Sequence, residues 1–102
     1  MTAPTIWTEQ AFVVATNHGP REVNGLVWGP FGLHATEHGV WTVTHLKTGY
    51  AVVGGFTLQQ VMQLCAEIRD ALDWERVKTV RKRSPLAIRA AIQRVRHEAV
   101  TL

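Results

Sequence analysis

The chain has 102 residues, of which 46% are hydrophobic and 19% are charged. This length predicts a single domain over residues 1–102, because two domains of about 50 residues each would bury too little apolar surface. Four Trp and three Phe residues exclude a wholly disordered chain. No apolar run approaches the roughly 18 residues that span a bilayer, and the N-terminus lacks the basic start and apolar core of a signal peptide. We therefore expect a cytoplasmic protein that does not bind a membrane.

The first half of the chain combines β-forming residues with turn signals. Residues 11–16 (AFVVAT) predict a strand that ends at the turn-forming residues 17–20 (NHGP). Asn24 and Gly25 form a pair that is typical of a tight turn, and a Gly-Pro-Phe-Gly stretch interrupts the pattern again. The sequence leaves open whether residues 23–36 form one kinked strand or two.

The clearest pattern in this half predicts a β-hairpin. Residues 39–46 (GVWTVTHL) and 50–53 (YAVV) flank a short loop whose last residue, Gly49, suits a left-handed backbone conformation. Three side chains share one face of the first strand: Trp41, Val43 and His45. We expect this face to lie in the core, because burial of an aromatic side chain removes the most apolar area per residue.

A helix is predicted after residues 54–56 (GGF), which we expect to end the sheet. Thr57 and Gln60 have the spacing of a capping box. Apolar residues then recur at three- and four-residue steps, which predicts an amphipathic helix that runs to Leu72 or Trp74 and packs on the sheet. Its apolar stripe consists of Leu58, Val61, Met62, Cys65, Ile68 and Leu72. Because Cys65 lies within the stripe, we interpret it as a small core residue.

A second helix is predicted to begin at Ser84 and Pro85, since serine is a favoured cap and proline is tolerated at the first helical position. Its apolar face consists of Ile88, Ala91, Ile92, Val95 and Ala99. Arg89, Gln93 and Arg96 recur at helical spacing on another face. Residues 73–83 contain no Gly or Pro, so the pattern also allows helix there.

These elements together predict an α+β fold. We expect a small antiparallel β-sheet of three to five strands that is packed by one amphipathic helix and followed by a basic C-terminal helix. Residues 1–56 form the β-rich part, and residues 57–102 form the helical and basic part.

The positive charge of the chain is concentrated in its second half. Residues 1–56 carry a net charge of −1, whereas residues 57–102 carry +4. Eight basic residues and no acidic one occur from residue 76 to residue 96. Such a segment repels itself unless a polyanion, an acidic protein surface or counterions neutralise it. The pattern is therefore typical either of a region that contacts phosphates or of a solvated basic face.

Binding of nucleic acid is the first hypothesis for this basic segment. We expect phosphate contacts first from Arg81, Lys82, Arg83, Arg89 and Arg96, with Lys78 beside them. Contacts of this kind carry little base specificity, because the phosphate backbone is the same at every position.

Signatures of catalysis and of metal binding are weak in this sequence. His34 and His38 have a ligand spacing that works on a helix, but glycines and β-forming residues surround them and no cysteine is near. Ser84, the only serine, is assigned to a helix cap, and the single cysteine, Cys65, lies on an apolar stripe. The glycines do not have the spacing of a phosphate loop. We therefore expect no disulfide, no enzyme activity, no metal and no cofactor.

One part of the chain resembles a known family. The residues 39–44 (GVWTVT), 47–49 (KTG) and 56–58 (FTL) describe a hairpin that leads into an amphipathic helix. This arrangement resembles the three-stranded-sheet-plus-helix DNA-binding domains at the N-termini of phage and transposon tyrosine recombinases. The resemblance covers less than half of the chain and does not include the basic helix. It implies a sheet face that enters the major groove, for which the matching strands offer one cation, Lys47, and the polar residues Thr42, Thr44 and His45.

Two other interpretations stay open. In general style the chain is similar to small accessory proteins of phages and mobile elements, which implies the cytoplasm of a bacterium or of a phage-infected cell. Such a protein can be a protein-binding module, for example an inhibitor of a bacterial defence complex or a virion component, that docks on an acidic protein surface. A homodimer completed by Trp7, Trp28 or Trp74 is the third possibility.

Overall fold

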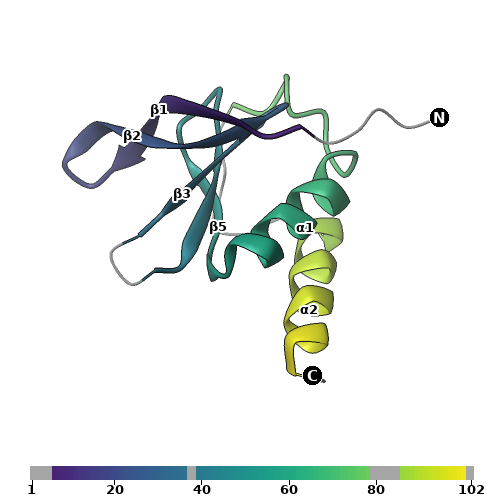
Figure 1. Cartoon of the computed structure of the whole chain (residues 1–102). Coiled ribbons are helices and arrows are strands. Elements are labelled where there is room, and N and C mark those ends of the chain that lie inside the picture. The colour runs from purple at the N-terminus through teal and green to yellow at the C-terminus, as the bar shows by residue number, and fades with distance from the viewer. Residues whose placement is uncertain (1–5, 37–38, 79–85, 101–102) are drawn as a thin grey trace.

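The computed structural model describes residues 6–36, 39–78 and 86–100, and within the last range the side chains of residues 88–95. The five strands are Thr8–Thr16 (β1), Gly19–Trp28 (β2), Phe31–Ala35 (β3), Trp41–His45 (β4) and Ala51–Phe56 (β5). The two helices are Leu58–Ile68 (α1) and Leu86–Val100 (α2). All strands belong to one antiparallel sheet in the order β1-β2-β3-β4-β5, which confirms the α+β class. Figure 1 shows this sheet beside the two helices.

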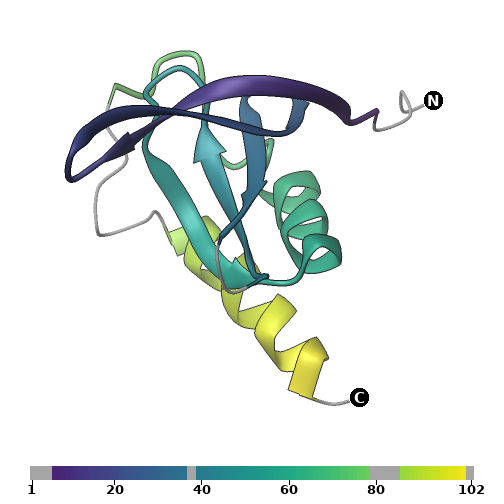
Figure 2. The same ribbon diagram turned by 60° about the vertical axis from the view of Figure 1, so that its left-hand side comes forward.

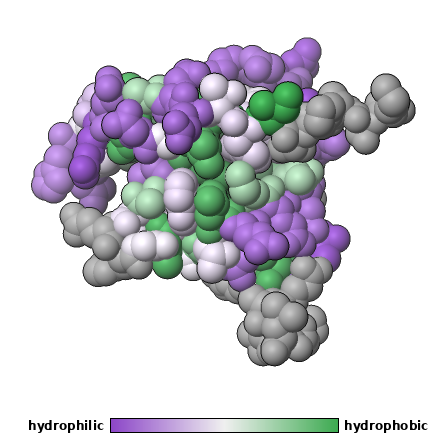
Figure 3. Space-filling view, in the orientation of Figure 1, coloured by the Kyte–Doolittle hydropathy of each residue, from purple (hydrophilic) through white to green (hydrophobic). Residues whose placement is uncertain are grey.

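The β1–β2 hairpin crosses over the rest of the sheet (Figure 2). Its strands pair over nine positions, from Thr8 with Val27 to Thr16 with Gly19. At the far end of β1, the Ala15 amide donates a hydrogen bond of 2.7 Å to the Gly49 carbonyl oxygen in the β4–β5 loop. The sheet therefore curls, and hydrophilic side chains cover this hairpin on the face shown in Figure 3.

Gly25 lies inside β2, and the predicted tight turn at Asn24 and Gly25 is wrong. A Cβ atom at Gly25 would lie 1.9 Å from the carbonyl oxygen of Leu33, so the glycine allows β2 and β3 to approach closely. The chain turns four residues later at Gly29, whose φ of 54° is left-handed. The open question over residues 23–36 is thus resolved as two strands, β2 and β3, joined by this turn.

The predicted hairpin over residues 39–53 is confirmed as β4 and β5. Residues 54–56 end the sheet as expected, but they do so as the last residues of β5, which runs to Phe56 instead of ending at Val53. Trp41 pairs with Phe56 and Thr42 with Gly54, so one extra residue, Gly55, forms a bulge. Gly55 has a φ of 88°, which explains why a glycine occurs at the bulge.

The Trp41, Val43 and His45 face of β4 lies in the core, as predicted. Val43 and His45 are fully buried, and Trp41 packs against the core cluster. Thr44, on the other face, is also buried, which the alternation did not predict. Thr44 pairs with Gly32, and the place of a Cβ atom at Gly32 is filled by the ring of Phe12 from β1. The curled β1–β2 hairpin therefore covers the second face of the sheet.

Helix α1 begins with the predicted capping box. The Thr57 hydroxyl accepts a hydrogen bond of 3.2 Å from the Gln60 amide, and the Gln60 side chain accepts one of 2.9 Å from the Thr57 amide. The prediction that this helix runs to Leu72 or Trp74 is wrong, because it ends at Ile68. The Trp74 indole folds back and donates a hydrogen bond of 3.1 Å to the Ile68 carbonyl oxygen. In a longer helix this oxygen would accept a backbone hydrogen bond instead.

Helix α2 packs on α1 through the apolar side chains that the sequence predicts. Ile88, Ala91 and Val95 are buried, and Ile92 is partly buried against the same core. The Ala99 side chain and the predicted cap at Ser84 and Pro85 lie outside the described residues. Of residues 73–83, the described part up to residue 78 contains no helix. No helix in the described ranges is long and apolar enough to cross a bilayer.

Candidate nucleic-acid interface

The structure places two of the six predicted phosphate-contacting side chains. Lys78 and Arg89 are both exposed. Arg96 belongs to α2, but its side chain lies outside the described part, as do the whole residues Arg81, Lys82 and Arg83. The segment that ends at Lys78 lies at one end of the molecule, and α2, with Arg89 in its first half, extends toward the other (Figure 1). The two described side chains therefore belong to two separate regions.

Lys78 belongs to a cationic depression that no sequence pattern indicated. The depression has a volume of about 600 Å³ and lies between the β4–β5 loop and residues 75–78. Its lining side chains are Lys47, Thr48, Glu75, Arg76, Val77 and Lys78. Lys47 comes from the β-rich half, so the fold brings one cation of that half to the start of the basic segment.

A buried histidine holds the two walls of this depression together. Nε2 of His45 lies 2.9 Å from the Trp74 carbonyl oxygen, which can only accept, so Nε2 carries the proton and donates it. Nδ1 then accepts from the Thr48 hydroxyl at 3.0 Å. The Lys47 ammonium donates to the Glu75 carbonyl oxygen. These hydrogen bonds fix the loop beside the segment that leads to Lys78.

The cations of the depression are only weakly neutralised. The Lys47 ammonium lies 3.9 Å from the Glu75 carboxylate, and the Arg76 guanidinium lies 3.3 Å from the Asp73 carboxylate. All four side chains are largely exposed to water, where such pairs are weak and easily exchanged. Lys78 has no ion pair with any side chain that the structure describes. The depression is therefore lined by three cations and one carboxylate, with the Asp73 carboxylate paired to Arg76.

Helix α2 presents a second set of polar side chains to solvent. Arg89 and Gln93, one turn apart, are exposed, opposite the buried Ile88 and Val95. The Arg94 guanidinium lies 3.7 Å from the Glu67 carboxylate of α1, so its charge is partly neutralised within the chain. Among the described side chains of α2, Arg89 is thus the cation that is free to meet a ligand.

Cys65, His34 and His38 are the residues that the sequence offers for catalysis or metal binding, and the structure describes the first two. Cys65 is fully buried, and burial raises the pKa of its thiol far above the ordinary value. Burial and, second, the charge of Arg21 lower the pKa of His34, whose Nδ1 is buried and has no hydrogen-bond partner there. His38 lies outside the described residues. Within them, no three His, Cys, Asp or Glu side chains are grouped so that they could hold a metal ion.

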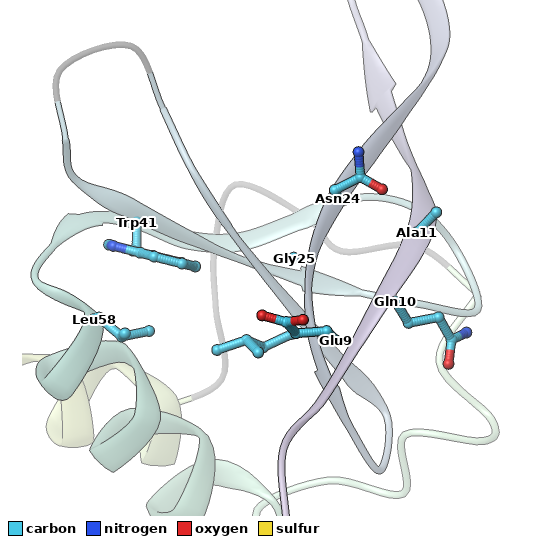
Figure 4. Close-up of a pocket in the computed structure, with 8 residues that line it drawn as sticks. Glu9, Gln10, Ala11, Asn24, Gly25, Trp41 and Leu58 are labelled. Atoms are coloured by element: carbon cyan, nitrogen blue, oxygen red, sulfur yellow. The ribbon is translucent and has the colours of Figure 1, made fainter.

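A second hollow lies on another part of the surface (Figure 4). It has a volume of about 690 Å³ and lies between the β1–β2 hairpin and the start of α1. Trp41 and Leu58 form one wall, and the Glu9 carboxylate points into the hollow from the opposite side. A carboxylate repels phosphate, and no cation is among the described residues that line this hollow, so it suits phosphate less well than the depression at Lys78 does.

Several aromatic and polar residues that the sequence offered as contacts are used inside the fold. Trp74 is buried within the chain, so of the three tryptophans offered for a dimer interface this one is not accessible to a partner. The rings of Trp7 and Trp28 lie 5.4 Å apart, and the Arg69 guanidinium lies 5.0 Å from the Trp28 ring centre. Thr44 and His45, two polar candidates on β4, are both buried and cannot reach a ligand.

Comparison with protein-family models, with curated proteins and with solved structures finds no match to this chain.

Proposed function

We propose that this protein binds nucleic acid without catalysis, through phosphate contacts made by its basic segment over residues 76–96. The observation that carries the proposal is the juxtaposition of Lys47 with Arg76 and Lys78 around one depression, where the acid-free run of eight basic residues begins. A cation from another part of the chain adds to the positive charge at that point. Phosphate oxygens are the natural ligands of such a group.

The exposed ion pairs of the depression support this proposal energetically. Lys47 and Arg76 can leave the carboxylates of Glu75 and Asp73 at little cost, because water already weakens both pairs. Binding of a polyanion gains more free energy than the loss of these two ion pairs costs, because each neutralised phosphate releases condensed counterions. Arg89 on α2 supplies a further exposed cation, and Arg81, Lys82 and Arg83 lie between the two regions in sequence.

Charge reversal of Arg81, Lys82 and Arg83 to glutamate tests the proposal. We expect the triple variant to lose its affinity for a nucleic acid at about 50 mM salt, because three attractive terms become repulsive. The variant Arg69→Glu is the control, since Arg69 lies outside the basic segment with its guanidinium over Trp28. Circular dichroism checks that each variant is folded. An unchanged affinity in the triple variant would show that the site is misplaced.

We propose as a second candidate that the chain is a protein-binding module, for example a phage inhibitor of a bacterial defence complex or a virion component. The hollow of Figure 4 favours this candidate, because its apolar wall of Trp41 and Leu58 faces the Glu9 carboxylate. A lysine or arginine side chain of a partner protein fits that combination of an aromatic ring and a carboxylate. No binding of wild-type protein to any nucleic acid at low salt would favour this candidate over the first.

A further inference from the structure

We propose that the nucleic acid bound at the depression is single-stranded, and that the ring of Tyr50 stacks on one of its unpaired bases. This inference rests on the proposed function and names its substrate class. Tyr50 directly precedes β5 and lies three residues after Lys47.

Tyr50 combines an exposed ring with a fixed backbone. Tyr50 is 47% exposed and is one of the few large apolar residues in the described ranges that face water. The Tyr50 amide donates a hydrogen bond of 3.2 Å to the Thr48 hydroxyl, and its carbonyl oxygen accepts one of 2.9 Å from the His45 amide. Within the described part of the chain, its phenol has no hydrogen bond and its ring has no aromatic neighbour. The ring is therefore open to a ligand while its Cα position is held.

The loop that carries Lys47 places Tyr50 beside the depression. The Tyr50 amide donates a hydrogen bond to the hydroxyl of Thr48, and Thr48 lines the depression together with Lys47. The Tyr50 carbonyl oxygen accepts from the amide of His45, whose ring contacts the carbonyl oxygen of Trp74. Trp74 directly precedes residues 75–78, which form the other wall of the depression. Tyr50 and three cations thus belong to one end of the molecule.

This combination fits an unpaired strand better than a duplex. In a duplex the faces of the bases are covered by their neighbours, so a protein aromatic side chain cannot stack on them without unstacking the helix. An unpaired strand exposes both its phosphates and the faces of its bases, and every base has such a face. Lys47, Arg76 and Lys78 then contact phosphates while Tyr50 covers a base. We therefore expect the protein to bind single strands of any base sequence.

Fluorescence anisotropy with a labelled oligothymidylate of about 12 nucleotides tests the inference, with the matching duplex as the second probe. We expect wild-type protein to prefer the single strand. Tyr50→Ala should weaken single-strand binding by about 5-fold to 150-fold, the range that loss of one stacked base produces. Tyr50→Phe should bind like wild type, because it keeps the ring. Ile6→Ala, which also removes an exposed apolar side chain (67% exposed), should bind like wild type.

The outcomes separate this inference from the proposed function. If the wild type binds the single strand and Tyr50→Ala binds equally well, stacking is refuted and phosphate binding stands. A wild-type preference for the duplex refutes the inference in the same way. If the wild type binds neither probe at about 50 mM salt, the proposed function and the inference both fail. The thermal unfolding temperature of each variant shows whether it is folded. If Tyr50→Ala is not folded, Tyr50→Leu serves as the second test.

Discussion

His45 and Trp74, 29 residues apart in sequence, are joined by a hydrogen bond and by a ring contact. Nε2 of His45 lies 2.9 Å from the Trp74 carbonyl oxygen, and the two ring centres lie 5.4 Å apart. The Trp74 ring also packs edge-on against Phe31, with centres 4.9 Å apart. This group connects the β-rich half to the segment that begins the basic run, so it positions the depression that we propose as the phosphate site.

Replacement of His45 by leucine should therefore lower stability. The substitution leaves the buried Trp74 carbonyl oxygen without its donor, which costs about 1–3 kcal/mol of the free energy of unfolding. Urea unfolding followed by tryptophan fluorescence measures this change. His18→Leu is the matched control, because His18 is exposed in the β1–β2 turn. Equal stabilities of the two variants would mean that the His45 hydrogen bond does not hold the halves together.

Replacement of Gly25 by alanine should be more damaging than replacement of Gly54. A Cβ atom at Gly25 would meet the Leu33 carbonyl oxygen at 1.9 Å, so β2 and β3 would have to separate. A Cβ atom at Gly54 meets only the Thr42 hydroxyl at 3.0 Å, and that side chain can rotate. We expect Gly25→Ala to lose about 3 kcal/mol or more of unfolding free energy, near the upper end of overpacking effects. Thermal unfolding of both variants measures the difference, and a similar loss in both would contradict the close approach of β2 and β3 at Gly25.

The stability of the protein should fall at acidic pH, in part because of His34. Burial, and then the charge of Arg21, lower the pKa of His34 below its ordinary value of 6.5. The unfolded chain therefore binds a proton at His34 more readily than the folded chain, and the free energy of unfolding decreases as the pH falls below 6.5. Above that pH the residue is neutral in both states and contributes no slope.

Urea unfolding of wild type and His34→Gln between about pH 7.5 and pH 5 measures this contribution. The glutamine variant should lose less stability over that interval than the wild type. His18→Gln, at an exposed position, should behave like the wild type. Parallel pH profiles for all three proteins would rule out the titration of His34 as a cause.

Local patterns in the sequence predicted much of the fold. The alternation in residues 39–46 depends only on neighbouring residues, and it correctly places Val43 and His45 in the core. The capping box at Thr57 and the apolar face of α2 are local signals of the same kind, and both are confirmed. The errors at Gly25 and at the end of α1 arise from contacts with Leu33 and Trp74 that become visible only after folding.

The candidate site was less accessible to sequence reasoning. The run of basic residues indicated the segment 76–96, including Lys78 and Arg89, as the proposed phosphate-contacting region. Charge counting could not show that these two side chains belong to separate regions. Nothing in the spacing of Lys47 and Lys78 indicates that they line one depression, because the link between them is the buried His45. Tyr50 was missed for a related reason, since a single tyrosine after a loop has no periodic signal.

The dependence of nucleic-acid affinity on salt tests the central proposal most directly. We predict that wild-type affinity for a single strand falls steeply between about 50 mM and 200 mM salt. The triple variant Lys47→Gln, Arg76→Gln and Lys78→Gln should bind more weakly, with a log–log slope shallower by about 0.7 for each phosphate that the variant no longer neutralises. The control Arg69→Gln should keep the wild-type slope. Equal slopes for the wild type and the triple variant, or wild-type affinity that does not change with salt, would contradict phosphate binding at this depression.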